Sequence, residues 1–500
     1  MRPFAARLPA FLFLLLAGAV ILSGRIPHRV AYDQLLYHQQ AIELFARQWP
    51  TPDLTDYLSA TTPAFHLALS LLVRAGLIGV MGMQWIGAGI TFVMLWWLGG
   101  VAATSMKPWH AAAAVVPVGL SMYVFASGAW VLPDNLAWLG VLAMVLLALA
   151  PRFGVRELAL GGIVLAALVC TRQIHAWTGG LLVASAWLSE SRRPAIAAGT
   201  LMPTGLVGDV RTVLFSHLGR RCVMAAASLV ACLPAMLVLV HFYGLWGGLV
   251  PPTFQYQYHM ANPAGPAFVL AVFGFVAIFF GGWVLPRVLE AWRRHAGWMV
   301  AFTLAGVVLA VVPATTAGTN ADYFAGRRTG LWDVAAKLPI IAQHSSTLIV
   351  ALSLCGMQAL GAFLASWRAR PAIIVACAFL GYGLAMAAGG ELWQRYAEPF
   401  ALMMMVVVLG LDARHRADNA PTSTTRLGSI ASAAAPAGAL ALAMLFAALV
   451  ARDLHKPGGQ RVTDPPPPSV TPSEQFPVPR RDSPWDRYMM RRPEWRKSSP

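Results

Sequence analysis

The sequence predicts an all-α fold, a polytopic transmembrane helical bundle of about 13 spans, and three observations lead to it. First, 58% of the 500 residues are hydrophobic and 12% are charged, whereas roughly a quarter of the residues in a soluble domain are charged. Second, apolar runs of roughly 15–25 residues, the length that crosses a hydrocarbon core, recur along the chain. Third, the polar–apolar alternation of membrane strands is absent, which excludes a barrel.

The predicted spans are 8–24, 82–101, 109–127, 135–150, 157–171, 176–189, 222–246, 266–286, 298–313, 346–366, 371–389, 397–411 and 430–450. They form one transmembrane domain over 1–450, in which 25–81 is the first outer loop. The tail over 451–500 is rich in Pro, Ser and Arg, a composition that predicts disorder. We expect the first helix to be retained and not cleaved as a signal peptide.

The charge distribution assigns the loops to sides of the membrane. With the amino terminus inside, the inner segments hold 18 Lys and Arg against 6 Asp and Glu, as the positive-inside rule requires. The further apolar run 63–79 is interrupted by His66 and Arg74, and counting it as a crossing would invert every later loop. We therefore predict an interfacial or re-entrant helix there. The same rule explains the net charge of +16 by membrane lipids, without nucleic acid as a partner.

Polar stretches that have no evident structural purpose all fall on the outer side under this topology. They are the opening loop 32–66 and the segments 133–135, 171–177, 251–259, 315–330 and 391–400. Because they come from distant parts of the chain and face one side, we expect them to meet in a single site.

Asp33 is the predicted catalytic residue of this site. It follows the first span by about nine residues, so its carboxylate lies near the membrane surface, where it can take a proton from an attacking hydroxyl. The alternative is an ordinary solvated loop acid. His38 lies on the same predicted helix, 33–47, and is a candidate substrate-binding residue.

The second half of the opening loop supplies further candidates. Asp56 is interpreted either as a binding residue or, like Asp53, as the cap of a helix beginning near Leu54. In "ATTP", Thr62 is predicted as a helix N-cap, with the proline at the first helical position. This start is expected to aim Thr62 and His66 into the site.

The segments 133–135 and 171–177 contribute charges beside hydrocarbon. Asp134 either caps the next span or faces the site. Arg172, Gln173 and His175 stand between two spans, where a charge is costly unless it meets a partner or a polar cavity. Arg and His suit a phosphate group, by forked hydrogen bonds and by a switchable charge; snorkelling to lipid headgroups is the alternative.

The later segments carry more candidates with two interpretations each. Arg395 and Glu398 either form a local ion pair on one helix or bind a phosphate and its substrate. Arg327 and Arg328 bind either substrate or headgroups, and His259 lies in a Tyr-rich stretch that is either a groove or an interfacial belt. The loop 315–345 is expected to order over a substrate.

Motifs of several enzyme classes are missing. The sequence has no Walker A loop, no GxGxxG after a strand, no HExxH and no GxSxG. It has no Asp-x-Asp pair for a divalent ion, and its five cysteines include no CxxC. We expect neither a metal nor a cofactor.

The order of these motifs resembles the GT-C superfamily of membrane glycosyltransferases, most closely the dolichyl-phosphate-glucose α-1,2-glucosyltransferase family. The matching elements are Asp33 with Gln34, "TTP" at 61–63, Arg172 with Gln173, and "QRYAEPF" at 394–400. The sequence departs from the family at Gln34, where the family has a second acid, and at 174–175, where it has Thr-Asn.

The resemblance implies an inverting transfer of a hexose, glucose favoured, from a polyprenyl-phosphate donor to a lipid-linked or envelope glycan. By this analogy Asp33 is the general base, and Arg172, His175 or Arg395 stabilises the departing phosphate. The Ala-, Arg- and Pro-rich composition without a glycosylation sequon predicts a bacterial inner membrane with a periplasmic site. The main alternative is a secondary transporter or flippase, which would show repeated halves and ionisable residues at mid-span. A non-enzymatic scaffold is the third reading.

Overall fold

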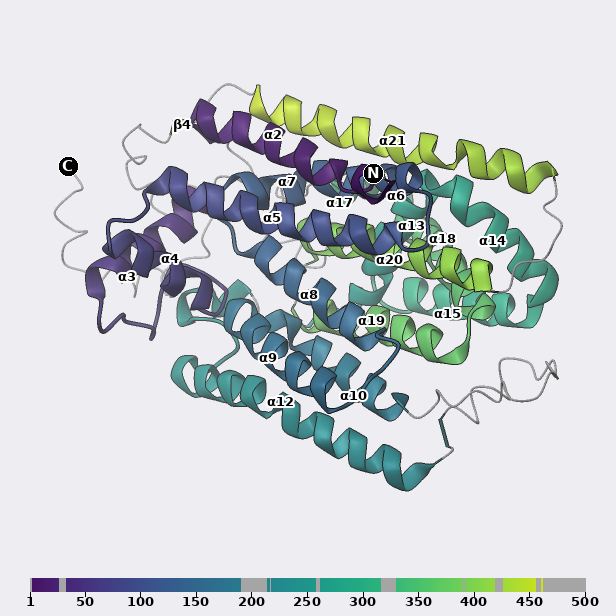
Figure 1. Cartoon of the computed structure of the whole chain (residues 1–500), viewed down its shortest axis with the longest axis horizontal. Helices are drawn as coiled ribbons and strands as arrows, with labels where there is room; N and C mark the ends of the chain where they lie inside the picture. The colour runs from purple at the N-terminus through teal and green to yellow at the C-terminus, as the bar shows by residue number, and fades with distance from the viewer. Residues whose placement is uncertain are drawn as a thin grey trace.

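The fold is a bundle of long helices that run roughly along the longest axis of the molecule (Figure 1). A computed structural model describes residues 2–26, 33–189, 214–215, 217–257, 261–315, 330–389, 392–418, 426–455 and 460–461. Within these ranges, strands are limited to two antiparallel pairs of two residues each. The predicted all-helical class is confirmed.

Helices occupy each of the predicted spans. They are α2 (Leu8–Ser23), α5 (Val80–Ala103), α6 (Pro108–Leu120), α7 (Met122–Ala129), α8 (Asp134–Ala148), α9 (Val155–Thr171), α10 (Gly179–Trp187), α12 (Leu218–Trp246), α13 (Gly265–Phe279), α14 (Gly281–Arg294), α15 (Ala296–Val311), α18 (Thr347–Ser366), α19 (Ala369–Ala388), α20 (Gln394–Asp418) and α21 (Arg426–Leu454). Among the described residues, six helices are long and apolar enough to cross a membrane, or up to eight if each of two bent pairs is one span. The chain is an integral membrane protein, and the number of 13 spans stays a prediction.

Two predicted spans are broken. The helices α6 and α7 meet at 68°, and α13 and α14 meet at 108°. The predicted spans 109–127 and 266–286 are therefore each bent within their length, and each bent pair is either one broken span or a re-entrant loop. After the second bend, α14 carries Arg287 and Glu290 among its apolar residues. Charged groups are costly inside hydrocarbon, so we expect this part of α14 to lie outside it.

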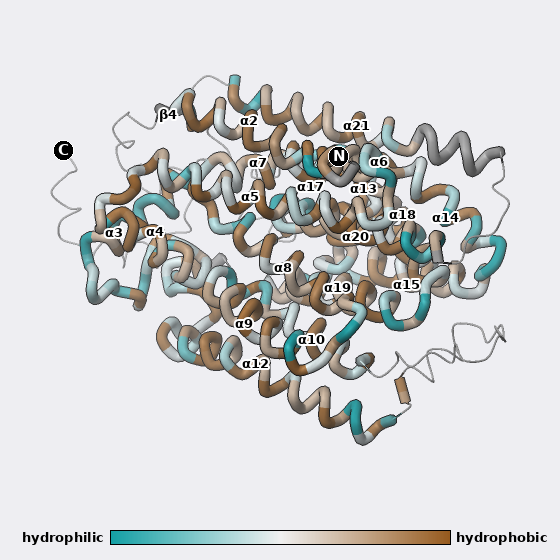
Figure 2. The backbone as a smooth tube through the Cα atoms, viewed as in Figure 1, coloured by the Kyte–Doolittle hydropathy of each residue, from teal (hydrophilic) through white to brown (hydrophobic). Residues whose placement is uncertain are grey.

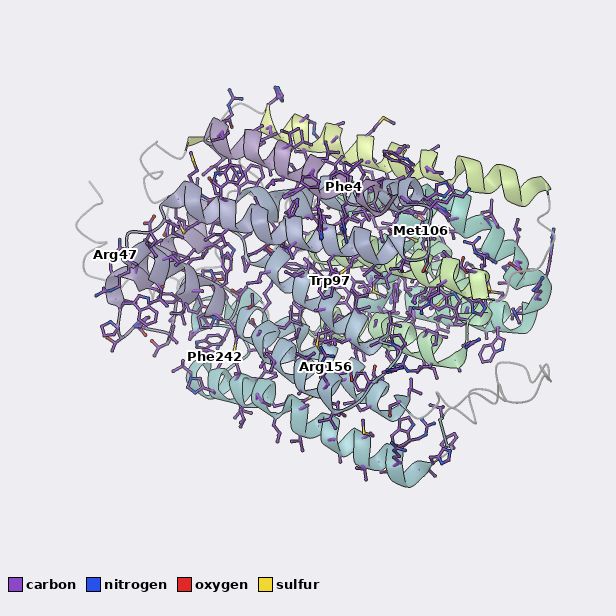
Figure 3. The ribbon with its side chains drawn as sticks, in the orientation of Figure 1. Phe4, Arg47, Trp97, Met106, Arg156 and Phe242 are labelled. Atoms are coloured by element: carbon purple, nitrogen blue, oxygen red, sulfur yellow. The ribbon has the colours of Figure 1, made fainter. Side chains whose placement is uncertain are left out.

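The first loop forms short helices at one end of the bundle: the π-helix η1 (Gln34–His38), α3 (Gln39–Gln48) and α4 (Ala64–Arg74). With 11 residues, α4 reaches about 16 Å at 1.5 Å per residue, about half the thickness of a hydrocarbon core. It is too short for a full crossing, in agreement with the prediction. Figure 1 shows α3 and α4 side by side at this end, and Figure 3 labels Arg47 there. The described chain has no helix beginning near Leu54, so that prediction is wrong.

Close backbone contact holds the middle of the bundle together. The helices α13 and α18 cross at Gly274 and Gly356. A Cβ added at Gly274 would stand 2.0 Å from the carbonyl oxygen of Leu352, and one added at Gly356 would stand 2.1 Å from that of Leu270. Small residues are the usual means of close helix approach in membranes. We infer that both positions require glycine.

Buried polar and aromatic side chains fasten the first loop to the bundle. The amide oxygen of Gln34, a fully buried residue, accepts hydrogen bonds from the backbone N–H of Val131 at 3.0 Å and from the side chain of Gln84 at 3.2 Å. Trp246, at the end of α12, donates to the carbonyl of Leu54 at 2.8 Å and packs near Phe242, which Figure 3 labels. Gln34 thus has a structural role where the resembling family has an acid.

The remaining elements are short. They are α1 (Arg2–Ala5), the 3-10 helices η2 (Gln173–Thr178) and η4 (Pro252–Gln257), α17 (Leu331–Ala335), and the strands β1 (Arg25–Ile26), β2 (Ile340–Ile341), β3 (Ser345–Ser346) and β4 (Gln460–Arg461). Because β1 pairs with β4, the segments that follow α2 and α21 lie at the same end of the bundle. Figure 2 shows hydrophobic residues along most of α12, and more hydrophilic stretches around α3 and α4 and around α14.

Candidate functional site

An ion pair joins the first loop to the start of α20. Asp33 immediately precedes η1, and its carboxylate pairs with the guanidinium of Arg395 in the first turn of α20. The two residues are 362 positions apart in the sequence. Their side chains are 22% and 27% exposed, so a dissolved molecule or a lipid headgroup can reach both.

A second ion pair lies beside the first. Asp134, the first residue of α8, pairs with Arg172, the residue between α9 and η2. These side chains are 15% and 12% exposed. Each acid has its own arginine, so the two pairs together carry no net charge.

Tyr396 connects the two pairs. The Arg172 guanidinium carbon lies 5.0 Å from the centre of the Tyr396 ring, and that of Arg395 lies 4.9 Å from it. Arg395 also donates from Nη2 to the Tyr396 hydroxyl at 3.0 Å. We call Asp33, Asp134, Arg172, Arg395 and Tyr396 the Asp33 cluster. The expected meeting of polar segments 33, 134, 172 and 395 is thus observed.

Aromatic rings pack under the Asp33 cluster. Tyr382 on α19 donates from its hydroxyl to the backbone carbonyl of Tyr396 at 2.5 Å. Its ring packs at 5.8 Å from Trp138 and 4.3 Å from Phe400. Trp177 packs against Tyr382 at 5.7 Å. This packing gives the charged groups a rigid, weakly polar base, in which electrostatic interactions are stronger than in water.

Two predicted site histidines form a buried pair. His38 Nδ1 lies 2.9 Å from His66 Nε2, and the rings are stacked at 5.2 Å. Burial lowers the pKa of His66 to about 3. Burial, the neighbouring His66 and the charges of Arg395 and Arg172 hold the pKa of His38 well below its usual value. Both imidazoles are therefore neutral at pH 7, and each can exchange a hydrogen bond without adding charge.

His175 is also neutral, which corrects one expectation. Its side chain is buried in η2 and packs edge-on against Trp138 at 4.9 Å. Burial and the charge of Arg172 lower its pKa to about 3. The proposal of a switchable positive charge at His175 is wrong, because desolvation penalises the charged imidazolium. The two arginines are the cations of the Asp33 cluster.

Gln173 and Thr62 position the loop that faces the Asp33 cluster. Gln173 accepts from the backbone N–H of Thr62 at 3.0 Å, and donates to the carbonyls of Ala60 at 2.9 Å and Leu249 at 2.8 Å. The Thr62 hydroxyl donates to the carbonyl of Val169 at 2.5 Å. It does not cap α4, whose N-cap position is Pro63, so the predicted cap is wrong. The carbonyl of Val169 is a long-range partner that no local pattern identifies.

The other acids of the loop have local or structural partners. Asp56 accepts from the backbone N–H and the hydroxyl of Thr253, at 3.2 and 2.8 Å, and so fastens η4 to the first loop. Asp53, which is exposed, accepts from the backbone N–H of Thr55 at 3.0 Å within a turn. Tyr37 packs against Phe254 at 5.8 Å, so η4 lies over η1.

Glu398 does not pair with Arg395, so of the two interpretations the local ion pair is wrong. Its carboxylate accepts from the Ser121 hydroxyl and from the Gln394 side chain, each at 2.5 Å. Arg395 turns instead to Asp33. The Gln394 oxygen in turn accepts from the backbone N–H of Leu331 at 2.6 Å, which ties α17 to the start of α20.

Three predicted binding residues, His259, Arg327 and Arg328, lie outside the described residues, as does the part 316–329 of the loop 315–345. Within the described ranges, no group of three or more His, Cys, Asp or Glu side chains is arranged to hold a metal ion.

The sequence reading missed Tyr396 and Trp138. Tyr396 follows Arg395 directly in "WQRYAEPF", and an Arg-Tyr pair beside a membrane surface is compatible with cation–π contact. Trp138 follows Asp134 by four residues and so lies on the same face of α8. Both signals were present, but single aromatic residues are too common in membrane helices to stand out.

Comparison with known proteins adds little. The chain matches no family model and no curated protein. A likeness exists to the crystal structure of ArnT from Cupriavidus metallidurans bound to undecaprenyl phosphate, at 15% identity, over 81% of this chain and 77% of that one. The TM-score is 0.31, and so loose a superposition sets neither the fold nor the function of the present chain.

Proposed function

We propose that the chain is a membrane glycosyltransferase of the GT-C type, which moves a sugar from a polyprenyl-phosphate donor to a glycan acceptor. The Asp33–Arg395 pair, with Arg172 beside it, is the observation that carries the proposal. It places a carboxylate for the acceptor and cations for the donor phosphate in one place. The bundle of apolar helices below can accommodate a polyprenyl tail, because a lipid-soluble chain is compatible with the surface of a membrane protein.

The reaction follows from these groups. An acceptor hydroxyl attacks the anomeric carbon from the face opposite the phosphate, and gives its proton to the carboxylate of Asp33. The bond between the anomeric carbon and the phosphate oxygen breaks, and the electron pair leaves with the phosphate. The sugar is transferred with inversion. Arg395 and Arg172 stabilise the charge that develops on the leaving phosphate.

The ion pair of Asp33 with Arg395 is consistent with this role. Before the donor binds, the guanidinium of Arg395 occupies the carboxylate of Asp33. A donor phosphate that binds Arg395 competes for this cation and so releases the carboxylate for the acceptor. During the reaction Asp33 becomes neutral while the phosphate gains one negative charge. Arg395 therefore keeps one anionic partner from beginning to end.

The finer assignments follow the sequence resemblance. We propose a hexose, with glucose favoured, as the transferred sugar, and a lipid-linked or envelope glycan as the acceptor. The proposed setting is a bacterial inner membrane with the Asp33 cluster on the periplasmic side. His38 and His66, which are neutral and contact each other, are proposed to hydrogen-bond the sugar or the acceptor. The charges of both arginines act on His38.

The experiment compares three proteins in purified membranes supplied with radiolabelled polyprenyl-phosphate sugars. They are the wild type, Asp33→Asn and Asp53→Asn. The last removes an exposed acid from the same loop, whose partner is a turn residue, and serves as the matched control. We expect transfer by wild type and Asp53→Asn, and a loss of at least about 100-fold in Asp33→Asn, the lower limit for a general base.

Two results would contradict the proposal in different ways. Equal transfer by Asp33→Asn and wild type would remove Asp33 as the base. An absence of transfer from every polyprenyl-phosphate sugar, together with substrate flux into liposomes, would favour a transporter.

A further inference from the structure

We propose that Tyr396 is the positioning residue that sets the spacing of Arg172 and Arg395 for one donor phosphate; the inference rests on the proposed function. The two guanidinium carbons lie at nearly the same distance, 5.0 and 4.9 Å, from one ring. The arginines come from segments more than 200 residues apart, and their acidic partners come from two further segments. Both arginines thus lie over the same ring, that of Tyr396.

The ring itself is held in place from below. The hydroxyl of Tyr382 bonds the backbone carbonyl of Tyr396 at 2.5 Å, and Tyr382 is packed among Trp138, Trp177 and Phe400. Tyr396 is 8% exposed, so it has little room to change its rotamer. A rigid ring can therefore fix two flexible arginine side chains.

The geometry also explains how the arginines can exchange partners. A cation over an aromatic face is stabilised without using its N–H donors, because the attraction comes from the ring quadrupole. Each arginine can then pass from a carboxylate to a phosphate while it stays over the ring. Without the ring, each guanidinium group would be positioned only by the anion that it contacts. The distance between the two arginines would then no longer be fixed for one phosphate.

The ring and the hydroxyl of Tyr396 make separable contributions. Tyr396→Phe keeps the ring and removes the 3.0 Å contact with Arg395 Nη2, whereas Tyr396→Leu removes both. We expect Tyr396→Leu to lose about tenfold in affinity for a phosphate ligand, the size of two modest cation–π contacts. Tyr396→Phe is expected to lose less than about threefold. Tyr243→Leu, at a 58% exposed tyrosine on α12, is the matched control.

The test measures binding of farnesyl phosphate and of farnesol to each purified protein. The ratio of the two affinities isolates the phosphate from the isoprenoid tail. A general loss of structure would weaken both ligands and leave the ratio unchanged. The inference predicts that the ratio falls in Tyr396→Leu and is kept in Tyr396→Phe and Tyr243→Leu.

The possible failures are distinguishable. If the wild type does not prefer farnesyl phosphate to farnesol, the proposed function itself is contradicted. If the wild type shows the preference and Tyr396→Leu retains it in full, the function stands and the role of Tyr396 is overturned. Donor KM, measured in the same variants, is expected to rise in parallel with the loss of the preference.

Discussion

The two ends of α20 carry two clusters of arginines and carboxylates that differ in design. At the start of the helix is the Asp33 cluster. At its end, Asp412, 2% exposed, accepts from Arg287 Nε at 3.1 Å and from Arg416 Nη2 at 3.0 Å. Glu290 pairs with Arg287 at 2.5 Å and with Arg294 at 3.3 Å. We call these five residues at the end of α20 the Asp412 cluster.

The difference indicates that the Asp412 cluster has a structural role and the Asp33 cluster a binding role. The Asp412 cluster joins α14 to α20, and its buried acid is held by two arginines, so no anion can easily replace it. In the Asp33 cluster each acid pairs with one arginine among the described residues, all four charged side chains are partly exposed, and the groups come from four distant segments. An arrangement with one acid per arginine can exchange a partner, whereas one with two arginines on a buried acid stabilises the fold.

Among the replacements described below, that of Arg395 should have the largest effect on sugar transfer. Arg395→Gln removes a cation that faces the developing phosphate charge, and loss of such a group costs about 100- to 1,000-fold in rate. Its counterpart at the other end, Arg416→Gln, should change transfer less than about threefold. Steady-state kcat/KM for the polyprenyl-phosphate sugar tests both. Comparable losses in the two variants would erase the distinction between the clusters.

Replacement of Asp412 should act on stability instead. Asp412→Asn leaves Arg287 and Arg416 without their shared anion, and breaking a buried pair costs about 3 kcal/mol. Unfolding in detergent should show this loss, while transfer per folded molecule stays near that of the wild type. A variant that is stable but inactive would show that the Asp412 cluster takes part in the reaction.

Replacement of Gln173 should give an intermediate effect. Gln173→Ala removes three hydrogen bonds between η2, the first loop and the carbonyl of Leu249, and we expect a cost of about 2 kcal/mol. Because the loop carries Asp33, kcat should also fall, by about tenfold. Arg74→Ala, which removes a 3.4 Å contact elsewhere on α4, is the control. An unchanged kcat in Gln173→Ala would mean that other contacts suffice to place the loop.

The last effect concerns pH and the buried histidine pair. The folded protein holds the pKa of His66 at about 3, below the value of about 6.5 in an unfolded chain. The contribution of neutral His66 to the free energy of unfolding is therefore fully present above pH 6.5, and it is lost as the pH falls from 6.5 toward 3. The expected slope is about 1.4 kcal/mol per pH unit for His66.

Unfolding of wild type and His66→Gln between pH 7.5 and 5 measures this slope. His38, whose pKa is also lowered, contributes with the same sign, so the variant should retain part of the pH dependence. Identical slopes in the two proteins would show that His66 titrates normally in the fold. The Asp412 cluster contains no histidine and should not contribute.

The sequence predicted more of the fold than of the site, for physical reasons. The lengths of the apolar runs predicted helices at all the expected spans, because a helix that crosses a hydrocarbon core needs a long apolar segment, which the sequence shows directly. The sequence did not predict the 108° bend between α13 and α14. The predicted topology placed Asp33, Arg172 and Arg395 on the same side of the membrane. Which ion pairs they form depends on tertiary packing, which the sequence does not show. Thus a local ion pair of Arg395 with Glu398, three residues away, was one of two interpretations, whereas Arg395 pairs with Asp33, 362 residues away.

The most direct test of the donor site uses a photoreactive polyprenyl phosphate whose reactive group is adjacent to the phosphate. After illumination of the membrane-embedded protein, the labelled peptides are identified by mass spectrometry. We predict labels in 33–39, 172–178 and 392–398, and their loss when excess farnesyl phosphate competes. Labels concentrated instead in 287–294 and 412–416, around the Asp412 cluster, would contradict the account.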